Sequence, residues 1–144
     1  MRKLLERTLQ GLEDTQALAQ ALLPLLPFGA VVALKGPLGA GKTTLVRFLA
    51  EALGFRGRVT SPTYTLIHHY PTPEGEVVHA DLYRLREPKT LFPLLEAARE
   101  GARLVLVEWG KPEMGADFLL TLTPLGETRR AELWEVNPAE EKGV

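Results

Sequence analysis

The sequence predicts an α/β fold in which helices pack on a sheet. Residues 31–34 form a short apolar run that leads into a glycine-rich turn and then a helical pattern. Residues 104–107 are a second continuous apolar run, typical of a strand buried on both faces. Residues 65–70 and 76–80 flank a turn at residues 71–75, and this order predicts an antiparallel hairpin.

The N-terminal segment predicts a strand followed by a helix. Residues 4–10 alternate weakly in polarity, which favours a strand. Residues 13–15 offer short oxygen-bearing side chains that can cap a helix N-terminus. The helix should end or kink at Pro24, because proline lacks the N–H that a helix interior needs. Its predicted apolar face comprises Leu18, Ala19, Leu22 and Leu23.

The glycine-rich turn fits the pattern Gly-x-x-x-x-Gly-Lys-[Ser/Thr] at every fixed position. Its glycines allow backbone conformations that other residues resist, so successive N–H groups can point at phosphate oxygens. An ordinary glycine-rich turn is the alternative, which the flanking strand and helix disfavour. A nucleoside triphosphate site is therefore predicted, in which the phosphates contact Gly36, Pro37, Leu38, Gly39, Ala40, Gly41, Lys42, Thr43 and Thr44.

The helix after this turn presents its N-terminus, with its partial positive charge, to the same anion. Lys42 can reach the β- and γ-phosphates, and the hydroxyl of Thr43 can ligate Mg²⁺. Gly54 stands where the helix should end. The predicted buried face of the helix comprises Leu45, Phe48, Leu49, Ala52 and Leu53.

The three histidines lie in the predicted hairpin, at His68, His69 and His79. Adjacent residues of a strand face opposite sides, so His68 and His69 cannot both point at one metal ion. We interpret the histidines as residues of the sheet surface rather than as metal ligands.

The C-terminal half predicts further helices and strands. A short helical stretch should begin at residues 87–88 and be interrupted by Pro93, and a second should end at Gly101 with Leu94, Leu95 and Ala98 on one face. Phe118, Leu120 and Leu122 alternate with mostly polar positions, as in a half-buried strand. The remaining segments are predicted as a loop, a turn, a returning strand and a frayed tail at residues 111–116, 124–127, 128–136 and 137–144.

Composition limits the class of protein. The 144 residues are expected to form one domain, residues 1–144. The formal net charge of −1 disfavours a protein that grips nucleic acid through its overall field. The absence of cysteine excludes disulfides and thiol catalysis, and no apolar run approaches the roughly 20 residues of a membrane span. The nucleotide motif, with no signal-peptide pattern, predicts a cytoplasmic protein without membrane contact.

A glycine-rich turn of this pattern is called a P-loop. A P-loop enzyme needs a carboxylate near its Mg²⁺, commonly at the end of a strand beside the turn. Glu108 follows four aliphatic residues and is the stronger candidate, whereas Asp81 follows a less apolar strand. Each could instead be a surface carboxylate. Trp109 is interpreted as a core or interface residue. The guanine-specifying pattern Asn-Lys-x-Asp is absent, and no insertion is long enough for the lid of an adenylate-kinase-like enzyme.

Four blocks of sequence together resemble the TsaE (YjeE) family, the ATPase component of bacterial tRNA threonylcarbamoyladenosine synthesis. They are Leu-Gly-Ala-Gly-Lys-Thr-Thr at residues 38–44, Ser-Pro-Thr-Tyr-Thr-Leu at 61–66, Asp-Leu-Tyr-Arg-Leu at 81–85 and Val-Glu-Trp at 107–109. The first block is common to many NTPases, whereas the second and third together are much more specific. The match departs from the family at residues 89–93, where the family usually has Glu-Leu-Glu.

The resemblance implies a P-loop NTPase three-layer fold with a mixed parallel and antiparallel central sheet. It implies ATP and Mg²⁺ as cofactors and Lys42, Asp81 and Glu108 as catalytic residues, with the metal at Thr43 and Glu108. It also implies a switch-like loop whose Thr63 contacts the nucleotide, and an arginine such as Arg129 near it.

The resemblance further implies that the TsaD–TsaB complex is the partner and that tRNA is reached only through that complex. ATP hydrolysis would then support turnover of the complex without transferring the threonylcarbamoyl group. Residues 13–16 could form a loop beside the base, although a packing helix is the favoured interpretation there. Two rivals remain, a small-molecule P-loop kinase and a nucleotide-gated interaction module in which hydrolysis is incidental.

Overall fold

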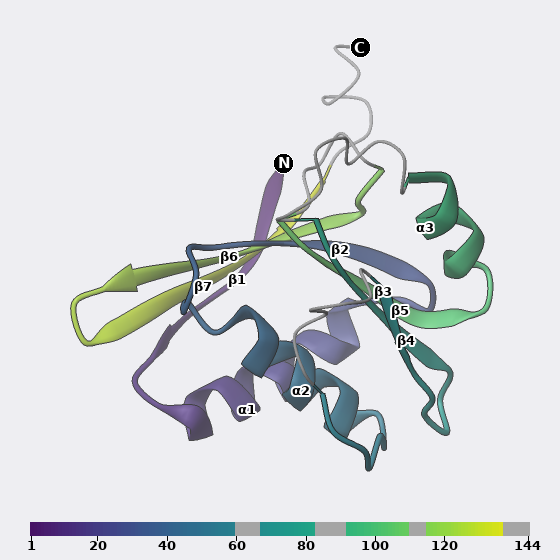
Figure 1. The fold of residues 1–144 in the computed structure, drawn as a ribbon. Helices are drawn as coiled ribbons and strands as arrows, with labels where there is room; N and C mark the ends of the chain where they lie inside the picture. The colour runs from purple at the N-terminus through teal and green to yellow at the C-terminus, as the bar shows by residue number, and fades with distance from the viewer. Residues whose placement is uncertain (60–66, 83–91, 110–114, 137–144) are drawn as a thin grey trace.

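The chain forms a seven-stranded mixed sheet with helices on both of its faces (Figure 1). The computed structural model describes residues 1–59, 67–82, 92–109 and 115–136. In chain order the elements are β1 Arg2–Leu9, α1 Leu12–Leu22, the 3-10 helix η1 Leu23–Leu25, β2 Ala30–Lys35, α2 Lys42–Ala52, β3 Ile67–Tyr70, β4 Glu76–Asp81, α3 Phe92–Arg99, β5 Ala102–Glu108, β6 Phe118–Leu125 and β7 Thr128–Glu135.

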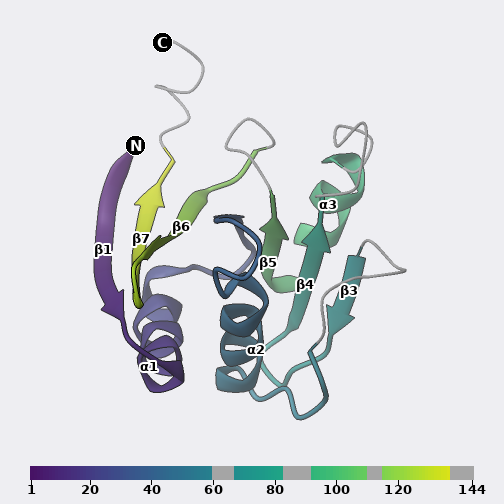
Figure 2. The ribbon, with the colours of Figure 1, turned by 60° about the vertical axis from the view of Figure 1, so that its left-hand side comes forward.

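The strand order is β1-β7-β6-β2-β5-β4-β3. Figure 2 labels β1, β7, β6, β5, β4 and β3 in this order across the sheet. Strands β6, β2, β5 and β4 are parallel, whereas β1, β7 and β3 pair antiparallel with their neighbours. The predicted mixed sheet is therefore confirmed. Because β2, β4 and β5 run in one direction, the segments that follow them meet at one edge of the sheet, where open α/β sheets bind ligands.

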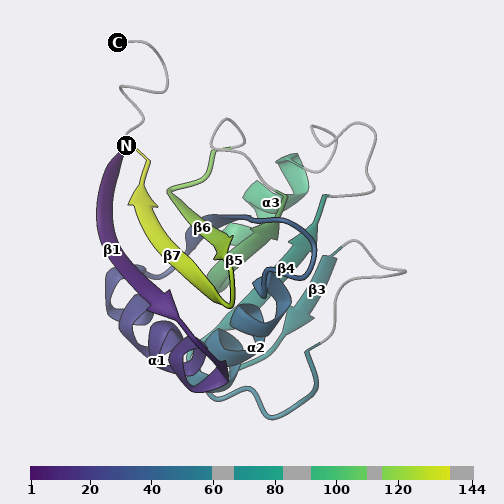
Figure 3. The same cartoon turned by 90° about the vertical axis from the view of Figure 1, so that its left-hand side faces the viewer.

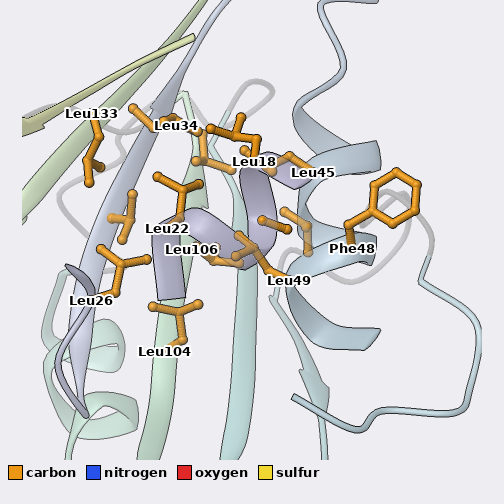
Figure 4. Packing of buried hydrophobic residues seen from close by; sticks show 14 of the residues in the cluster. Leu18, Leu22, Leu26, Leu34, Leu45, Phe48, Leu49, Leu104, Leu106 and Leu133 are labelled. Carbon is orange, nitrogen blue, oxygen red and sulfur yellow. The ribbon is translucent and has the colours of Figure 1, made fainter. Parts of the chain in front are cut away.

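The two sides of the sheet form separate hydrophobic clusters because successive strand residues face opposite sides. Leu34, Leu104 and Leu106 pack with α1 and α2 (Figure 4). Val105 and Val107 face the other side, where Leu95 of α3 packs. Helices α1 and α2 lie side by side in front of the sheet in Figure 3, with α3 behind it. Residues 104–107 are thus buried on both faces, as predicted.

The predicted helix start at residues 13–15 is wrong. Helix α1 begins at Leu12, and its N-cap is Gly11, which makes no side-chain capping bond. Asp14 lies inside the first turn, where its Oδ2 accepts a bond of 2.8 Å from the backbone N–H of Gln10. The acid still satisfies a free N–H at the helix entrance, but from a position further along the chain.

Two predicted core positions are exposed. Ala52 of α2 faces solvent, while Val46 and Ala50 are buried, because α2 packs against α1 as well as the sheet. Leu94 of α3 is 55% exposed, and Leu95 alone of this helix is fully buried. Helical periodicity predicted both helices, but it does not indicate how many other elements pack against each helix.

The predicted turn at residues 124–127 is shorter in the structure. Strand β6 continues through Leu125, and β7 starts at Thr128, so Gly126 and Glu127 make the connection. Gly126 has a φ of +65°, a conformation suited to glycine in a tight hairpin turn. The predictions for residues 63, 87–88, 111–114 and 137–144 lie outside the described residues. Within the described part of the chain, no helix has the length and apolar character needed to cross a membrane.

Replacing Leu106 by alanine should lower the free energy of unfolding by about 2–5 kcal/mol, because it leaves a cavity in the core beside the interior strand β5. Leu106 has no exposed surface. Leu94→Ala is the matched control and should change stability by no more than about 0.5 kcal/mol, since Leu94 is mostly in solvent. Urea denaturation followed by circular dichroism measures both. Equal losses in the two variants would contradict the assigned core.

Candidate functional site

The glycine-rich turn joins the end of β2 to the start of α2. Gly39 and Gly41 have φ angles of +80° and +100°, which favour glycine. Gly41 is the N-cap of α2, so the helix N-terminus opens directly onto the turn. A Cβ atom on Gly36 would lie 2.8 Å from the carbonyl oxygen of Leu122. The backbone of β6 therefore packs tightly against the turn, and the predicted strand, turn and helix are confirmed.

Lys42 is the first residue of α2 and is only 4% exposed. Its Nζ donates hydrogen bonds to the carbonyl oxygens of Gly36 and Pro37, at 2.5 and 3.1 Å. The same ammonium group lies 4.2 Å from the ring centroid of Trp109. Burial lowers the pKa of Lys42, and the charges of Glu108 and Asp81 oppose that shift. The lysine is thus held at the centre of the turn, within the field of two carboxylates.

Both predicted carboxylates lie at the ends of neighbouring parallel strands. The register of β4 and β5 pairs Asp81 with Glu108 directly. The Thr43 Oγ1 hydroxyl donates to Glu108 Oε2 at 3.1 Å, which ties the first turn of α2 to the end of β5. Glu108 is 4% exposed and is therefore no surface carboxylate. The sequence left a choice between the two acids, whereas the fold brings them together.

The prediction that the histidines lie on the sheet surface is wrong for His79. Its side chain is fully buried, and Nε2 lies 2.5 Å from Glu108 Oε2. Strand β4 lies between β3 and β5 and is therefore an interior strand. His79 is on the side of this strand that faces the core beneath α2. His69 is exposed, as predicted, and it contacts Glu76. A signal was present in the sequence, since His79 precedes Asp81 by two positions and must share its strand face.

A cleft of about 320 Å³ lies over these groups. Its lining residues are Leu12, Leu38, Gly39, Gly41, Lys42, Thr43, Thr44, Asp81, Glu108, Trp109 and Arg129. A Cβ atom on Gly41 would lie 2.7 Å from Arg129 Nη1, so the guanidinium rests against the turn. Residues 13–16 belong to α1 rather than to a loop, which confirms the packing-helix interpretation. Thr63, also predicted at the site, lies outside the described residues.

Trp109 follows Glu108 and forms a wall of the cleft. It has a φ of +63°, and its N–H donates to the carbonyl oxygen of Leu34 at 3.1 Å. A bulky residue in this conformation is strained and persists only where the surroundings hold it in place. The ring thus contributes to the site by covering Lys42, a role that its description as a core or interface residue did not anticipate.

The oxygen donors at the base of the cleft suit a small hard cation. Thr43 offers a hydroxyl, and Asp81 and Glu108 offer carboxylates, all from the cleft lining. In the described ranges, no group of three or more His, Cys, Asp or Glu side chains is placed to hold a metal alone. Mg²⁺ suits such a partial set, because it commonly takes one or two protein oxygens and completes its shell with phosphate and water.

A profile of the family described as threonylcarbamoyl adenosine biosynthesis protein TsaE matches residues 9–131. The chain belongs to the TsaE family. It is 39% identical to the tRNA threonylcarbamoyladenosine biosynthesis protein TsaE of Aquifex aeolicus over 132 residues, which cover 90% of this chain and 95% of the relative. It is 38% identical to the TsaE protein of Haemophilus influenzae over 121 residues, 80% of this chain and 77% of that protein. The resemblance based on the four sequence blocks is confirmed.

The fold also matches that of a solved structure. The crystal structure of Bacillus subtilis YdiB superposes with a TM-score of 0.74 and 26% sequence identity. The alignment covers 99% of this chain and 93% of YdiB. The likeness supports the three-layer P-loop fold that the TsaE resemblance implied.

Replacing Gly36 by alanine should weaken ATP binding at least about tenfold and destabilise the fold by about 1–3 kcal/mol. The added methyl group would meet a backbone oxygen of β6, so the turn itself must move. Calorimetric titration with ATP and urea denaturation measure the two effects. Gly101→Ala is the matched control, since nothing lies within 4 Å of a Cβ atom there. Wild-type affinity in Gly36→Ala would contradict the turn as the phosphate site.

Proposed function

We propose that this TsaE family member is a Mg²⁺-dependent ATPase that acts with the TsaD–TsaB complex in tRNA threonylcarbamoyladenosine biosynthesis. The observation that carries the proposal is the convergence of Lys42 and Thr43 with Asp81 and Glu108 in one cleft. A P-loop ATPase needs a phosphate cradle, a lysine, a metal-ligating hydroxyl and acids within reach of the γ-phosphate. Membership of the TsaE family supports a role in threonylcarbamoyladenosine biosynthesis.

The turn binds the triphosphate through its backbone and Lys42. The N–H groups of residues 36–44 and the N-terminus of α2 provide the cradle. Lys42 exchanges its bonds to the loop carbonyls for bonds to the β- and γ-phosphates, which are stronger partners because they are charged. At the outer wall, Leu12 and Arg129 offer an apolar surface and a planar guanidinium that can accept the base.

Thr43 and Glu108 would hold Mg²⁺, which would supply charge neutralisation at the phosphates. The Thr43 oxygen can offer a lone pair to the cation while its O–H still donates a hydrogen bond to Glu108. Asp81 lies beside Glu108 in the register and would position the attacking water or the metal. Phosphate is then transferred to water, and the threonylcarbamoyl group is left to the partner complex.

The partner complex, rather than this chain, handles the tRNA. The formal net charge is −1, so no strong overall positive field is present to attract a phosphate backbone. The chain is proposed to act in the cytoplasm, where ATP, Mg²⁺ and the tRNA substrate occur together.

The purified chain should hydrolyse ATP in the presence of Mg²⁺, and the TsaD–TsaB complex should stimulate it. Lys42→Ala should weaken ATP binding by about 2–4 kcal/mol, roughly 30- to 1,000-fold, because a buried charge partner is lost. Glu108→Gln should keep ATP binding but lower the hydrolysis rate about 100-fold or more. Phosphate release and calorimetric titration measure these quantities.

Glu100→Gln is the control for removal of a carboxylate, because Glu100 is exposed after α3 and away from the cleft. It should retain wild-type rates. If Glu108→Gln bound ATP normally, lost hydrolysis and still supported full tRNA modification with its partners, hydrolysis at this site would not be the function. Transfer of phosphate to an added small molecule rather than water would favour the kinase alternative.

A further inference from the structure

The buried imidazole of His79 lies beneath the cleft and has no part in the ATPase roles described above. Along β4, residues 77, 79 and 81 share one face of the strand. His79 therefore points toward α2, on the same side as Asp81, but one step deeper in the sheet. It is not among the residues that line the cleft. A ligand in the cleft would meet Asp81 and Glu108, with His79 behind them.

The ring of His79 is held on its other side by aromatic packing. Its centroid lies 6.1 Å from that of Tyr70, which in turn lies 5.0 Å from the ring of Phe55. The Tyr70 hydroxyl also contacts His68 Nδ1 at 3.1 Å. This packing fixes the plane of the imidazole, so Nε2 stays directed at Glu108.

A histidine is a costly choice for this position if its role is packing alone. Nδ1 is buried and has no hydrogen-bond partner among the residues that the structure describes, and Nε2 bonds only to Glu108 there. An apolar side chain of similar size would fill the same space without an unsatisfied polar atom. Among the described residues, the polar contact that the buried imidazole makes is its hydrogen bond to the Glu108 carboxylate.

That bond shares its acceptor with the metal-ligand hydroxyl. Thr43 Oγ1 and His79 Nε2 both donate to the same oxygen, Oε2 of Glu108. One donor comes from α2, on the cleft side, and the other comes from the interior of the sheet. Because two bonds meet on one oxygen, rotating the carboxylate would break both. His79 donates the hydrogen bond on the side of Glu108 that faces away from the proposed nucleotide site.

We propose that His79 is a positioning residue: its Nε2–H fixes the Glu108 carboxylate in the orientation that Mg²⁺ and the Thr43 hydroxyl require. The inference rests on the proposed ATPase function. Partners behind a ligating group commonly change metal affinity or activity by about 10- to 100-fold when they are removed. His79 acts through Glu108 and contacts neither nucleotide nor metal.

The test compares three substitutions that differ in one hydrogen-bond donor. His79→Gln places an amide N–H at about the reach of Nε2, His79→Asn places one too short to reach, and His79→Leu has none. In His79→Leu and His79→Asn, kcat for ATP hydrolysis should fall about 10- to 100-fold. The KM for MgATP should rise only as far as the metal's contribution to affinity falls, because the phosphate cradle is intact. His79→Gln should recover most of kcat.

A second readout is independent of turnover. Calorimetric titration with a non-hydrolysable ATP analogue, with and without Mg²⁺, gives the gain in affinity that the metal provides. This gain should shrink in His79→Leu and His79→Asn and return in His79→Gln, while affinity without Mg²⁺ stays near that of the wild type. Urea denaturation of each variant confirms that the folded protein is being compared.

The outcomes separate the two proposals. If His79→Leu and His79→Asn lose stability but keep wild-type kcat and the wild-type Mg²⁺ effect, His79 is a packing residue and the inference is overturned. Equal losses in the Gln, Asn and Leu variants would also overturn it, since the donor would then not matter. If the wild type neither hydrolyses ATP nor binds it more tightly with Mg²⁺, the ATPase function fails first. Should His79→Leu not fold, the contrast between His79→Gln and His79→Asn decides.

Discussion

The buried carboxylate of Glu108 is the group on which the arrangement of the site depends. A carboxylate that is 4% exposed must find hydrogen-bond donors, because an uncompensated buried charge is strongly unfavourable. Its donors come from two other elements, Thr43 at the start of α2 and His79 within β4. One acid thereby links the helix after the glycine-rich turn to two neighbouring strands, and the turn is held over the end of the sheet.

The parallel strands make this convergence possible. Strands β2, β5 and β4 run side by side in one direction, so the turn, Glu108 and Asp81 follow from their ends at the same edge. Strand β6 completes the arrangement, because its backbone passes so close to Gly36 that a side chain there has no room. The antiparallel strands β1, β7 and β3 extend the sheet outward, and β7 contributes Arg129 to the cleft lining.

Features that depend on local sequence were predicted well. The glycine-rich turn, the strand at residues 104–107 and the hairpin of β3 and β4 each follow from a few adjacent residues. Features that depend on which helices and strands pack together were not predicted well. Ala52 and Leu94 fit the helical period but are exposed, and His79 fits a surface strand but is buried in a strand that lies between β3 and β5. Periodicity indicates the direction in which a side chain points, but not whether another element packs against it.

The sequence by itself determined the glycine-rich turn, the two acids worth considering and membership of the TsaE family, because each is carried by residues at fixed short spacings. Only the tertiary structure decided that Asp81 and Glu108 lie at one place, 27 residues apart in the chain but paired in register. It also decided that His79 stands behind them. The reason is that hydrogen-bond register between strands sets which side chains meet, and no local pattern of residues states that register.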